Sequence, residues 1–355
     1  MTTRHLVLAA LTAALAECRR EDGVPPPRPG RLGAALWPVA VGLGWRQRDD
    51  HEAIAAATPG IDFLELRIED FLAPSGAIRQ RLLDVAGRLP VSLQGVSLGL
   101  GSAAGIDWQH LKAVRALVEA VKPGLVSEPA CFNRVERHHA PMHAHALLPI
   151  PFSERGLSLL AAQVDTVQQT LGRQILLENL ATCVAWDEDA MREAEFFNAL
   201  VARTGCGLLL DLTNLQVNAL NRGRDEEGAV RDCLAWLDEI DSAAVGQYHV
   251  AGRITIDGRA VAAPGRTVDE STWAIYRHAL GRIGARPTLI ERDGTPPPMT
   301  ALLADIARAR REQDGFAREA IAPPPPRPNS RSAPPGRVLR HTVRAALKEA
   351  RHVAQ

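Results

Sequence analysis

Short apolar stretches recur along the chain, and most of them end in a side chain that can bind a metal or carry a proton. Longer stretches between them have apolar positions at three- and four-residue spacing, as in residues 77–89, 110–121 and 157–171. The first pattern predicts buried parallel strands, and the second predicts helices that cover them. The expected strands are VAVGLGWR, FLELRIE, VSLQGVSL, LVSEP, ILLENL, LLLDLTN, GQYHVAG and TLIERD. Strands that alternate with helices about eight times predict a (β/α)8 TIM barrel.

The ends of the chain have a different composition from the barrel. We expect the barrel at residues 31–315, after an N-terminal helix and a Pro-rich connector at residues 1–30. Residues 316–355 hold a Pro-rich linker and a short basic helix, which we expect to be flexible. Two alternatives stay open: a short signal segment at residues 6–16, and a C-terminal helix that docks on a partner or on the barrel.

The composition of the chain argues against a nucleic-acid-binding protein and against a membrane protein. The 355 residues include 41 Lys and Arg against 41 Asp and Glu, so the net charge is zero and no nucleic-acid partner is indicated. No apolar run reaches the ~20 residues needed to cross a membrane, so no membrane partner is expected either. The five cysteines form no CxxC pair, and this odd, scattered set predicts reduced thiols and a cytoplasmic location.

The polar strand ends predict a metal site. In a TIM barrel the C-terminal ends of the strands meet at one mouth, so carboxylates, amides and imidazoles gather there. Gathered carboxylates raise one another's pKa unless a cation neutralises them. A mixed set of His, Asp and Glu suits non-haem iron, manganese or zinc. One acidic residue after one strand is more often a helix N-cap, so the prediction depends on the whole set.

A second histidine-rich stretch lies outside the strand ends. Residues 137–145 contain four of the eleven histidines. We expect this stretch to form a solvent-exposed loop, with a supplementary metal ligand or a substrate contact as the alternative.

Several segments, taken in their order along the chain, resemble the motifs of one family. They are VGLGWR, FLELRIED, SLQGVSLGLGS, SEPACF, LLPIPFSE, LGRQILLENL, MREAEFF, RTGCGLLLDLTNLQVNALN, YHVAGR and PTLIERD. Together they resemble the DUF692 family, the multinuclear non-haem iron-dependent oxidative enzymes (MNIO), over about residues 37–311. The resemblance implies a xylose-isomerase-like TIM barrel with several irons that uses dioxygen to modify a ribosomally made precursor peptide, often at cysteine. It also implies a partner protein that binds the leader peptide.

The resemblance also implies a set of metal ligands. The matching positions are His51, Glu128, Glu178, Asp211, Asn214, His249 and Glu291. Weaker candidates for the same site are Glu65, Gln94, Asn179, Arg253, Asp257 and Asp293.

The chain also departs from the family pattern. Gln94 stands where the family has histidine in L-H-G-V, and Pro129 stands where it has histidine in S-E-H. Arg253 follows the glycine of YHVAG, and residues 262–264 stand where a D-x-H pair is expected. Glutamine is a poor substitute for imidazole and proline has no side-chain donor, so we expect one to three iron ions and fewer than the family norm.

Three functions remain open from the sequence. The first is an iron-dependent oxidative enzyme that acts on a peptide with a reduced metal complement. The second is a degenerate, non-catalytic member without metal that serves as a binding or scaffold partner. The third is another metal-dependent barrel enzyme, such as a sugar isomerase or a phosphodiesterase.

Overall fold

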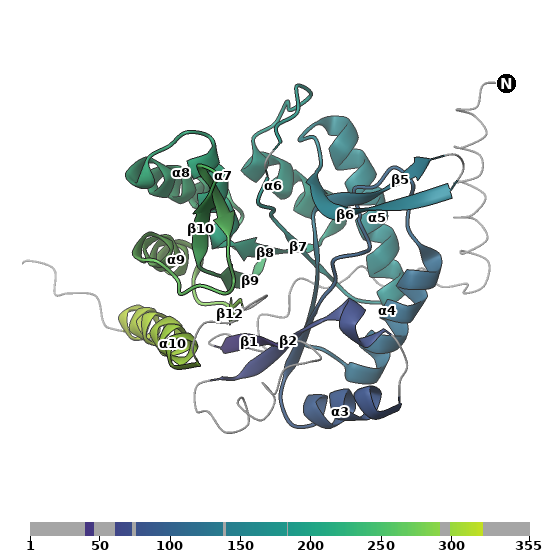
Figure 1. Cartoon of the computed structure of the whole chain (residues 1–355), viewed down its shortest axis with the longest axis horizontal. Helices are drawn as coiled ribbons and strands as arrows, with labels where there is room; N and C mark the ends of the chain where they lie inside the picture. Colours follow the sequence, from purple (N-terminus) through teal and green to yellow (C-terminus); the bar gives the residue numbers. More distant parts are fainter. Residues whose placement is uncertain are drawn as a thin grey trace, which may run out of the picture. The chain divides into compact units, whose positions relative to one another are not determined.

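The central feature is a closed parallel barrel, seen in Figure 1. The computed structural model describes residues 40–45, 61–72, 76–137, 140–182, 184–291 and 299–321. The barrel strands are β1 (Val41–Trp45), β2 (Phe63–Arg67), β3 (Val91–Gln94), β4 (Leu125–Pro129), β7 (Leu176–Glu178), β8 (Gly207–Asp211), β9 (Val245–Val250) and β12 (Thr288–Ile290). Their order around the barrel is β1, β12, β9, β8, β7, β4, β3, β2. The predicted (β/α)8 barrel is therefore confirmed, with each expected strand in place.

Helices between the strands cover the barrel. They are η1 (Ile68–Phe71), α3 (Gly76–Ala86), α4 (Trp108–Val121), α5 (Glu154–Leu171), α6 (Glu193–Thr204), α7 (Leu212–Asn221), α8 (Glu226–Glu239), α9 (Glu270–Ile283) and α10 (Met299–Ile321). Local sequence fixes several of their starts, because the side chains of Asp107, Ser153 and Asp225 accept backbone N–H groups as N-caps. Apolar residues on the helices and on the outer faces of the strands form the main core.

The side chains that fill the barrel interior differ between the two ends of the strands. Ala40, Phe63 and Leu289 form a small apolar cluster separate from the main core. Gly42 leaves room for this cluster, because a Cβ there would lie 2.4 Å from the Phe63 ring. Two residues further along β2, the same face carries Glu65, which is 1% exposed. The interior is thus apolar near the strand starts and becomes polar toward the C-terminal ends.

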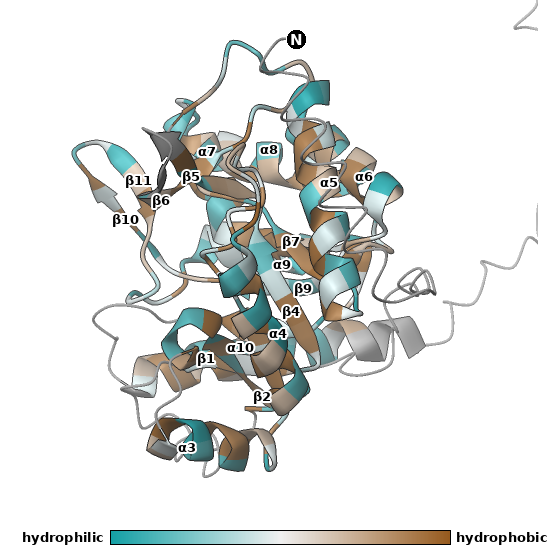
Figure 2. Ribbon diagram, turned by 90° about the vertical axis from the view of Figure 1, so that its right-hand side faces the viewer, coloured by the Kyte–Doolittle hydropathy of each residue, from teal (hydrophilic) through white to brown (hydrophobic). Residues whose placement is uncertain are grey.

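Two antiparallel hairpins interrupt the βα alternation, and the sequence pattern did not predict them. Strand β5 (Cys131–Arg137) pairs with β6 (Ala140–Pro149), and β10 (Arg253–Ile256) pairs with β11 (Arg259–Ala262). In Figure 2 both hairpins project from one end of the barrel. The loop expected at residues 137–145 is corrected here, since residues 140–145 belong to strand β6, on which His143 is exposed. A hairpin strand obtains its hydrogen bonds from its partner, so it needs no apolar run.

Several expectations about the chain ends lie outside the described residues. These are the N-terminal helix, the Pro-rich connector and the basic C-terminal helix. Helix α10 continues to Ile321, past the barrel end expected at residue 315. None of the helices in the described ranges combines the length and the apolar character that crossing a membrane requires.

Candidate metal centre

Four side chains from neighbouring strands converge at the mouth of the barrel. Glu178 ends β7, Asp211 ends β8, His249 lies on β9, and Glu291 directly follows β12. One potential ligand atom from each lies within 4.8 Å of the others, although the residues are far apart in sequence. The barrel order places these strands side by side, so the fold itself assembles the group. We call these four residues the His249 centre.

His249 occupies the middle of this arrangement. Its Nδ1 atom lies 3.2 Å from Glu291 Oε1 and 3.6 Å from Glu178 Oε1, while its Nε2 atom lies 3.0 Å from Glu65 Oε1. The imidazole is fully buried. Within the described residues Nδ1 makes no well-aligned hydrogen bond, despite the two carboxylates beside it. The ring nitrogen therefore faces both carboxylates, and the Glu291 oxygen is the nearer of the two.

The electrostatics of this centre are unfavourable without a cation. Burial raises the pKa of Asp211 to about 7, and the negative charge of Glu291 adds to the effect. Burial also raises the pKa of Glu178 well above its ordinary value, although the charge of His249 opposes this. For His249, burial lowers the pKa, but Glu65 and Glu291 outweigh it and raise the pKa well above the usual range. One imidazolium cannot offset so many carboxylates, whereas a divalent ion can.

Buried amide and hydroxyl groups orient the surrounding carboxylates. Gln94 Nε2 donates to Glu178 Oε2 at 2.9 Å. Gln247 Nε2 and Ser92 Oγ both donate to Glu65 Oε2, at 2.6 and 2.8 Å. Sequence reasoning missed Gln247 and Ser92, although each stands two residues before a predicted site residue and so shares its face of the strand. These contacts fix the orientation of Glu178 and Glu65 around the imidazole.

Asn179 and Asn214 support Asp211. Asn179 donates from Nδ2 to the Asp211 carbonyl and accepts from the Asp211 backbone N–H, both at 2.9 Å. Asp211 is also the N-cap of α7, because its Oδ1 accepts from the Asn214 backbone at 2.8 Å. Asn214 donates from Nδ2 to the Asn179 carbonyl. The capping role expected for a strand-end acid and the position in the His249 centre therefore coincide in Asp211.

Glu128 lies apart from the four-residue group. It is 1% exposed on β4, and neither carboxylate oxygen has a hydrogen bond of good geometry within the described residues. Burial raises its pKa well above the ordinary value, followed by the charge of Glu69, with Glu178 having a smaller effect. Gly95 gives the carboxylate room, because a Cβ there would lie 1.7 Å from Glu128 Oε1.

The remaining predicted site residues lie elsewhere or outside the described ranges. Arg253 was considered as a cation for the mouth, but its guanidinium pairs with Glu226 on α8 and with Asp269 at 2.9 Å. Asp257 is exposed in the turn between β10 and β11. His51 and Asp293 lie outside the residues that the structure describes.

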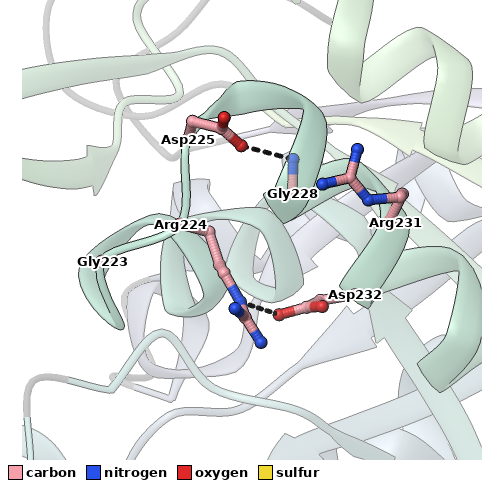
Figure 3. A pocket seen from close by; sticks show the side chains of 6 residues that line it. All are labelled: Gly223, Arg224, Asp225, Gly228, Arg231 and Asp232. Carbon is pink, nitrogen blue, oxygen red and sulfur yellow. Dashed lines mark hydrogen bonds and ion pairs between the residues drawn. The ribbon is translucent and has the colours of Figure 1, made fainter.

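A surface hollow at the start of α8 is a separate feature, drawn in Figure 3. Asp225 caps the Gly228 N–H at 2.8 Å, and Arg224 pairs with Asp232 at 2.7 Å. Arg231, which also lines the hollow, lies 3.7 Å from Glu227, so each charged side chain of the hollow has a partner, in contrast to the carboxylates of the barrel mouth.

The donor set of the His249 centre fits a metal ion. Three carboxylates and one imidazole are typical ligands of first-row transition metals such as iron, manganese and zinc. The buried His249 Nδ1 lies beside two carboxylates, and the raised pKa values of Glu178 and Asp211 show that burial there disfavours the ionised carboxylates, so a shared cation fits this centre.

Two sequence relatives match most of the length of this chain. A UPF0276 protein of Chromobacterium violaceum is 40% identical over 273 residues, covering 77% of this chain and 94% of the relative. A UPF0276 protein of Rhizorhabdus wittichii is 38% identical over 280 residues, covering 79% of this chain and 96% of the relative. A xylose isomerase-like TIM barrel protein from Mycobacterium smegmatis aligns at 12% identity, with a TM-score of 0.49, over 78% of this chain and 97% of that one.

The family model matches almost the whole barrel. The model described as RiPP precursor modification enzyme MbnB/TglH/ChrH covers residues 40–314. This match confirms the resemblance carried by the motifs at the strand ends. The chain belongs to the MbnB/TglH/ChrH family of RiPP precursor modification enzymes.

Proposed function

We propose that this chain is a metal-dependent enzyme that oxidises a residue, cysteine in particular, in a ribosomally made precursor peptide. The observation that carries the proposal is the His249 centre at the mouth of a barrel of this family. The proposed metal is iron, held by Glu178, Asp211, His249 and Glu291, in fewer copies than the family norm. Bound iron would supply the redox chemistry with dioxygen.

The protein residues prepare the site for that chemistry. Gln94 and Asn179 hold Glu178 and Asp211 in fixed orientations, which lowers the cost of gathering charged ligands. Glu65 lies 3.0 Å from His249 Nε2 and fixes the ring so that Nδ1 faces Glu178 and Glu291. Full burial of His249 keeps bulk water away from this side of the centre.

Apolar groups around the mouth support a peptide substrate. The large hydrophobic side chains that are exposed in the described part of the chain are Trp108, Val135, Leu147, Val184, Ile256 and Val261. Every one lies on a segment that follows the C-terminal end of a barrel strand. Exposed apolar groups on segments that leave the same end of the barrel support a partner larger than a small polar metabolite. A separate leader-binding protein would extend this surface.

The reducing interior of the cell suits such an enzyme. Cys131, Cys206 and Cys233 are buried free thiols, so a cytoplasmic location is the one we propose.

A second function is favoured by one contact. Gln94 replaces the family histidine, and its Nε2 donates to Glu178, which occupies one oxygen of a proposed ligand. This contact supports a non-catalytic relative that retains the barrel and binds a peptide or a partner.

The proposal is tested by measuring the iron content and the peptide-oxidising activity of one protein preparation. Wild-type chain purified without oxygen or chelators should contain iron and should consume dioxygen with a cysteine-containing precursor peptide. His249→Ala should lose both properties, while His278→Ala, which removes a partly exposed imidazole paired with Asp238, should keep both. A folded wild-type chain without iron, or with iron but without peptide oxidation, would favour the non-catalytic function.

A further inference from the structure

The β10–β11 hairpin, which projects from the barrel in Figure 2, has one strand edge that is covered by a side chain. On β11 the Ala260 N–H donates to Asn221 Oδ1, and Asn221 Nδ2 donates to the Ala260 carbonyl, both at 2.9 Å. Asn221 is the last residue of α7, so its amide takes the place of a third strand on this side. The outer edge of β11 is therefore protected against pairing with another chain.

The opposite edge, on β10, is open. Thr255 lies opposite Ala260, and Ala263 N–H donates to the Gly252 carbonyl at 2.8 Å. Hydrogen-bonded pairs alternate along an antiparallel ladder, so Arg253 and Thr255 point their N–H and C=O groups away from β11. No hydrogen bond in the described part of the chain uses these four groups, and Thr255 is exposed. We call these four groups the β10 edge.

Apolar side chains line one face of the hairpin beside this edge. Ile254 and Ile256 flank Thr255 and share one face, and Val261 lies opposite Ile254 on that same face. Ile256 is 51% exposed and Val261 is 39% exposed, whereas Ala260 on the other face is buried. An extended chain that pairs with β10 would place every second side chain beside these apolar groups.

The position and the length of the β10 edge favour a peptide substrate over a second copy of this chain. Thr255 follows His249 by six residues, so even a fully extended chain keeps it within about 20 Å of the His249 centre. A dimer through two such edges would bury little area, because β10 has only four residues and a stable interface needs about 800 Å² from each partner. A substrate that leaves after each reaction needs no such area.

We infer that the β10 edge binds the precursor peptide as an added strand. The inference rests on the proposed function for the identity of the peptide and names the surface that holds it. The N–H and the C=O of Thr255 pair with the peptide backbone, while apolar peptide side chains pack on Ile254 and Ile256. Backbone pairing accepts many sequences, so the preference is for an extended segment with apolar residues at every second position.

Peptide binding to the metal-free, full-length chain tests this edge without any assay of activity. The probe is a fluorescently labelled synthetic peptide in which valine and threonine alternate around one cysteine, and its anisotropy reports binding. Thr255→Pro removes an N–H that no bond inside the hairpin uses, and proline is tolerated at an edge position that faces solvent. The wild-type chain should bind the probe, and Thr255→Pro should bind it about tenfold more weakly or worse.

Matched variants separate loss of the edge from damage to the hairpin. Thr255→Val keeps the N–H, and Ala262→Pro places a proline at an outward position of β11, so both should bind the probe as the wild type does. Circular dichroism confirms that each variant is folded. If Thr255→Pro does not fold, a probe with methylated backbone nitrogens carries the test, because it cannot donate to the Thr255 carbonyl and should not bind.

Four results would overturn the inference. They are a wild-type chain that does not bind the probe, equal binding by Thr255→Pro, equal binding of the methylated probe, and a loss in Ala262→Pro as large as that in Thr255→Pro. A dimer seen by sedimentation and abolished by Thr255→Pro would assign the edge to a second copy and would also overturn it.

Failure of this inference can be distinguished from failure of the proposed function. Probe binding that Thr255→Pro weakens, without oxidation of any peptide, would refute the proposed function and leave the β10 edge as a peptide-binding surface. Peptide oxidation with the same KM in the wild-type chain and in Thr255→Pro would refute the β10 edge and leave the proposed function standing.

Discussion

At the scale of single residues, Asn179 determines where Asp211 stands. Its amide makes two hydrogen bonds to the backbone of Asp211, and all the atoms involved are buried. These bonds join the end of β7 to the end of β8, and both ends carry a residue of the His249 centre. The side chain thus acts on the centre through the backbone of its neighbour.

Replacement of Asn179 by alanine should weaken both the fold and the metal site. The Asp211 N–H and C=O would lose their partners away from water, at a cost of about 1–3 kcal/mol each. We expect a free energy of unfolding lower by about 2–4 kcal/mol and a weaker affinity for Mn²⁺ at the His249 centre. Denaturant unfolding and manganese titration measure the two effects.

Asn198 provides a matched control at the surface. It also donates to one backbone carbonyl, of Glu239, and accepts from one backbone N–H, of Asp241, but these groups are exposed. Water can replace both bonds in Asn198→Ala, so its loss of stability should be clearly smaller and its metal affinity unchanged. Equal losses in the two variants would show that burial at Asn179 does not matter.

Sequence reasoning identified part of the site for a physical reason. The four residues of the His249 centre each lie at or next to the C-terminal end of a buried strand, and these ends meet at one mouth in any parallel barrel. Ser92 and Gln247, which donate to Glu65, were not predicted, because neither is a strong metal ligand and their contact depends on the register of the barrel strands. The sequence carries the order of the strands but not that register.

At the scale of elements, the β10–β11 hairpin is held by one arginine. Arg253 is 17% exposed and pairs with Glu226 on α8 and with Asp269, the N-cap of α9. These contacts connect the hairpin to two covering helices. The segment that replaces the D-x-H pair of the family therefore has a structural anchor of its own.

Arg253→Met should loosen the hairpin while keeping most of the side-chain volume. Removing one partner leaves two carboxylates without their cation in a partly buried place, so we expect a loss of about 1–2 kcal/mol. Limited proteolysis should cut faster near Asp257. Arg192→Met, at a pair with Glu239 whose arginine is 70% exposed, should cost about 0–1 kcal/mol and leave proteolysis unchanged. An identical cutting rate in Arg253→Met would contradict the anchoring role.

This hairpin could have been found from the sequence. Asp257 and Gly258 both have positive φ angles, 49° and 77°, in a two-residue connection. Asp-Gly is the sequence signature of such a type I′ turn between paired strands. The pattern of a βα unit after every strand favours a helix at this position instead. The sequence signal for the β5–β6 hairpin is weaker, because its histidine-rich sequence resembles a polar loop.

At the scale of the whole molecule, the barrel buries several carboxyl groups near the C-terminal ends of its strands. Continuous apolar strands and amphipathic helices made the fold predictable, because a sheet covered on both faces leaves few alternatives. The same closure forces polar strand ends into the interior. Glu128, Glu178 and Asp211 all have raised pKa values through burial, so the folded chain holds protons that the unfolded chain releases.

The raised pKa values of these buried carboxyl groups predict how the stability of the metal-free chain depends on pH. The unfolded carboxyls ionise near their ordinary values of 3.8 and 4.5, whereas folded Asp211 ionises near pH 7. His249, with its raised pKa, also loses its stabilising charge as the pH rises. Stability should therefore fall from about pH 5 to about pH 8. The pKa of Glu65 is lowered in the folded chain, so its carboxylate is ionised in both the folded and the unfolded chain well above pH 4.5. Its contribution to stability is therefore constant over this range and does not reverse the trend.

Bound metal should reverse this dependence. Metal ligands must be deprotonated, so Mn²⁺ binds more tightly and stabilises the fold more at higher pH. Urea unfolding at about pH 5.5 and about pH 8 should show a lower midpoint at the higher pH in chelator, and a higher midpoint with saturating Mn²⁺. The double variant Glu178→Gln, Asp211→Asn should flatten the chelator profile, since two of the groups that release protons are gone. A midpoint that rises with pH in chelator would mean that the barrel mouth tolerates its ionised carboxylates without a cation, and the argument for a metal from buried charge would fail.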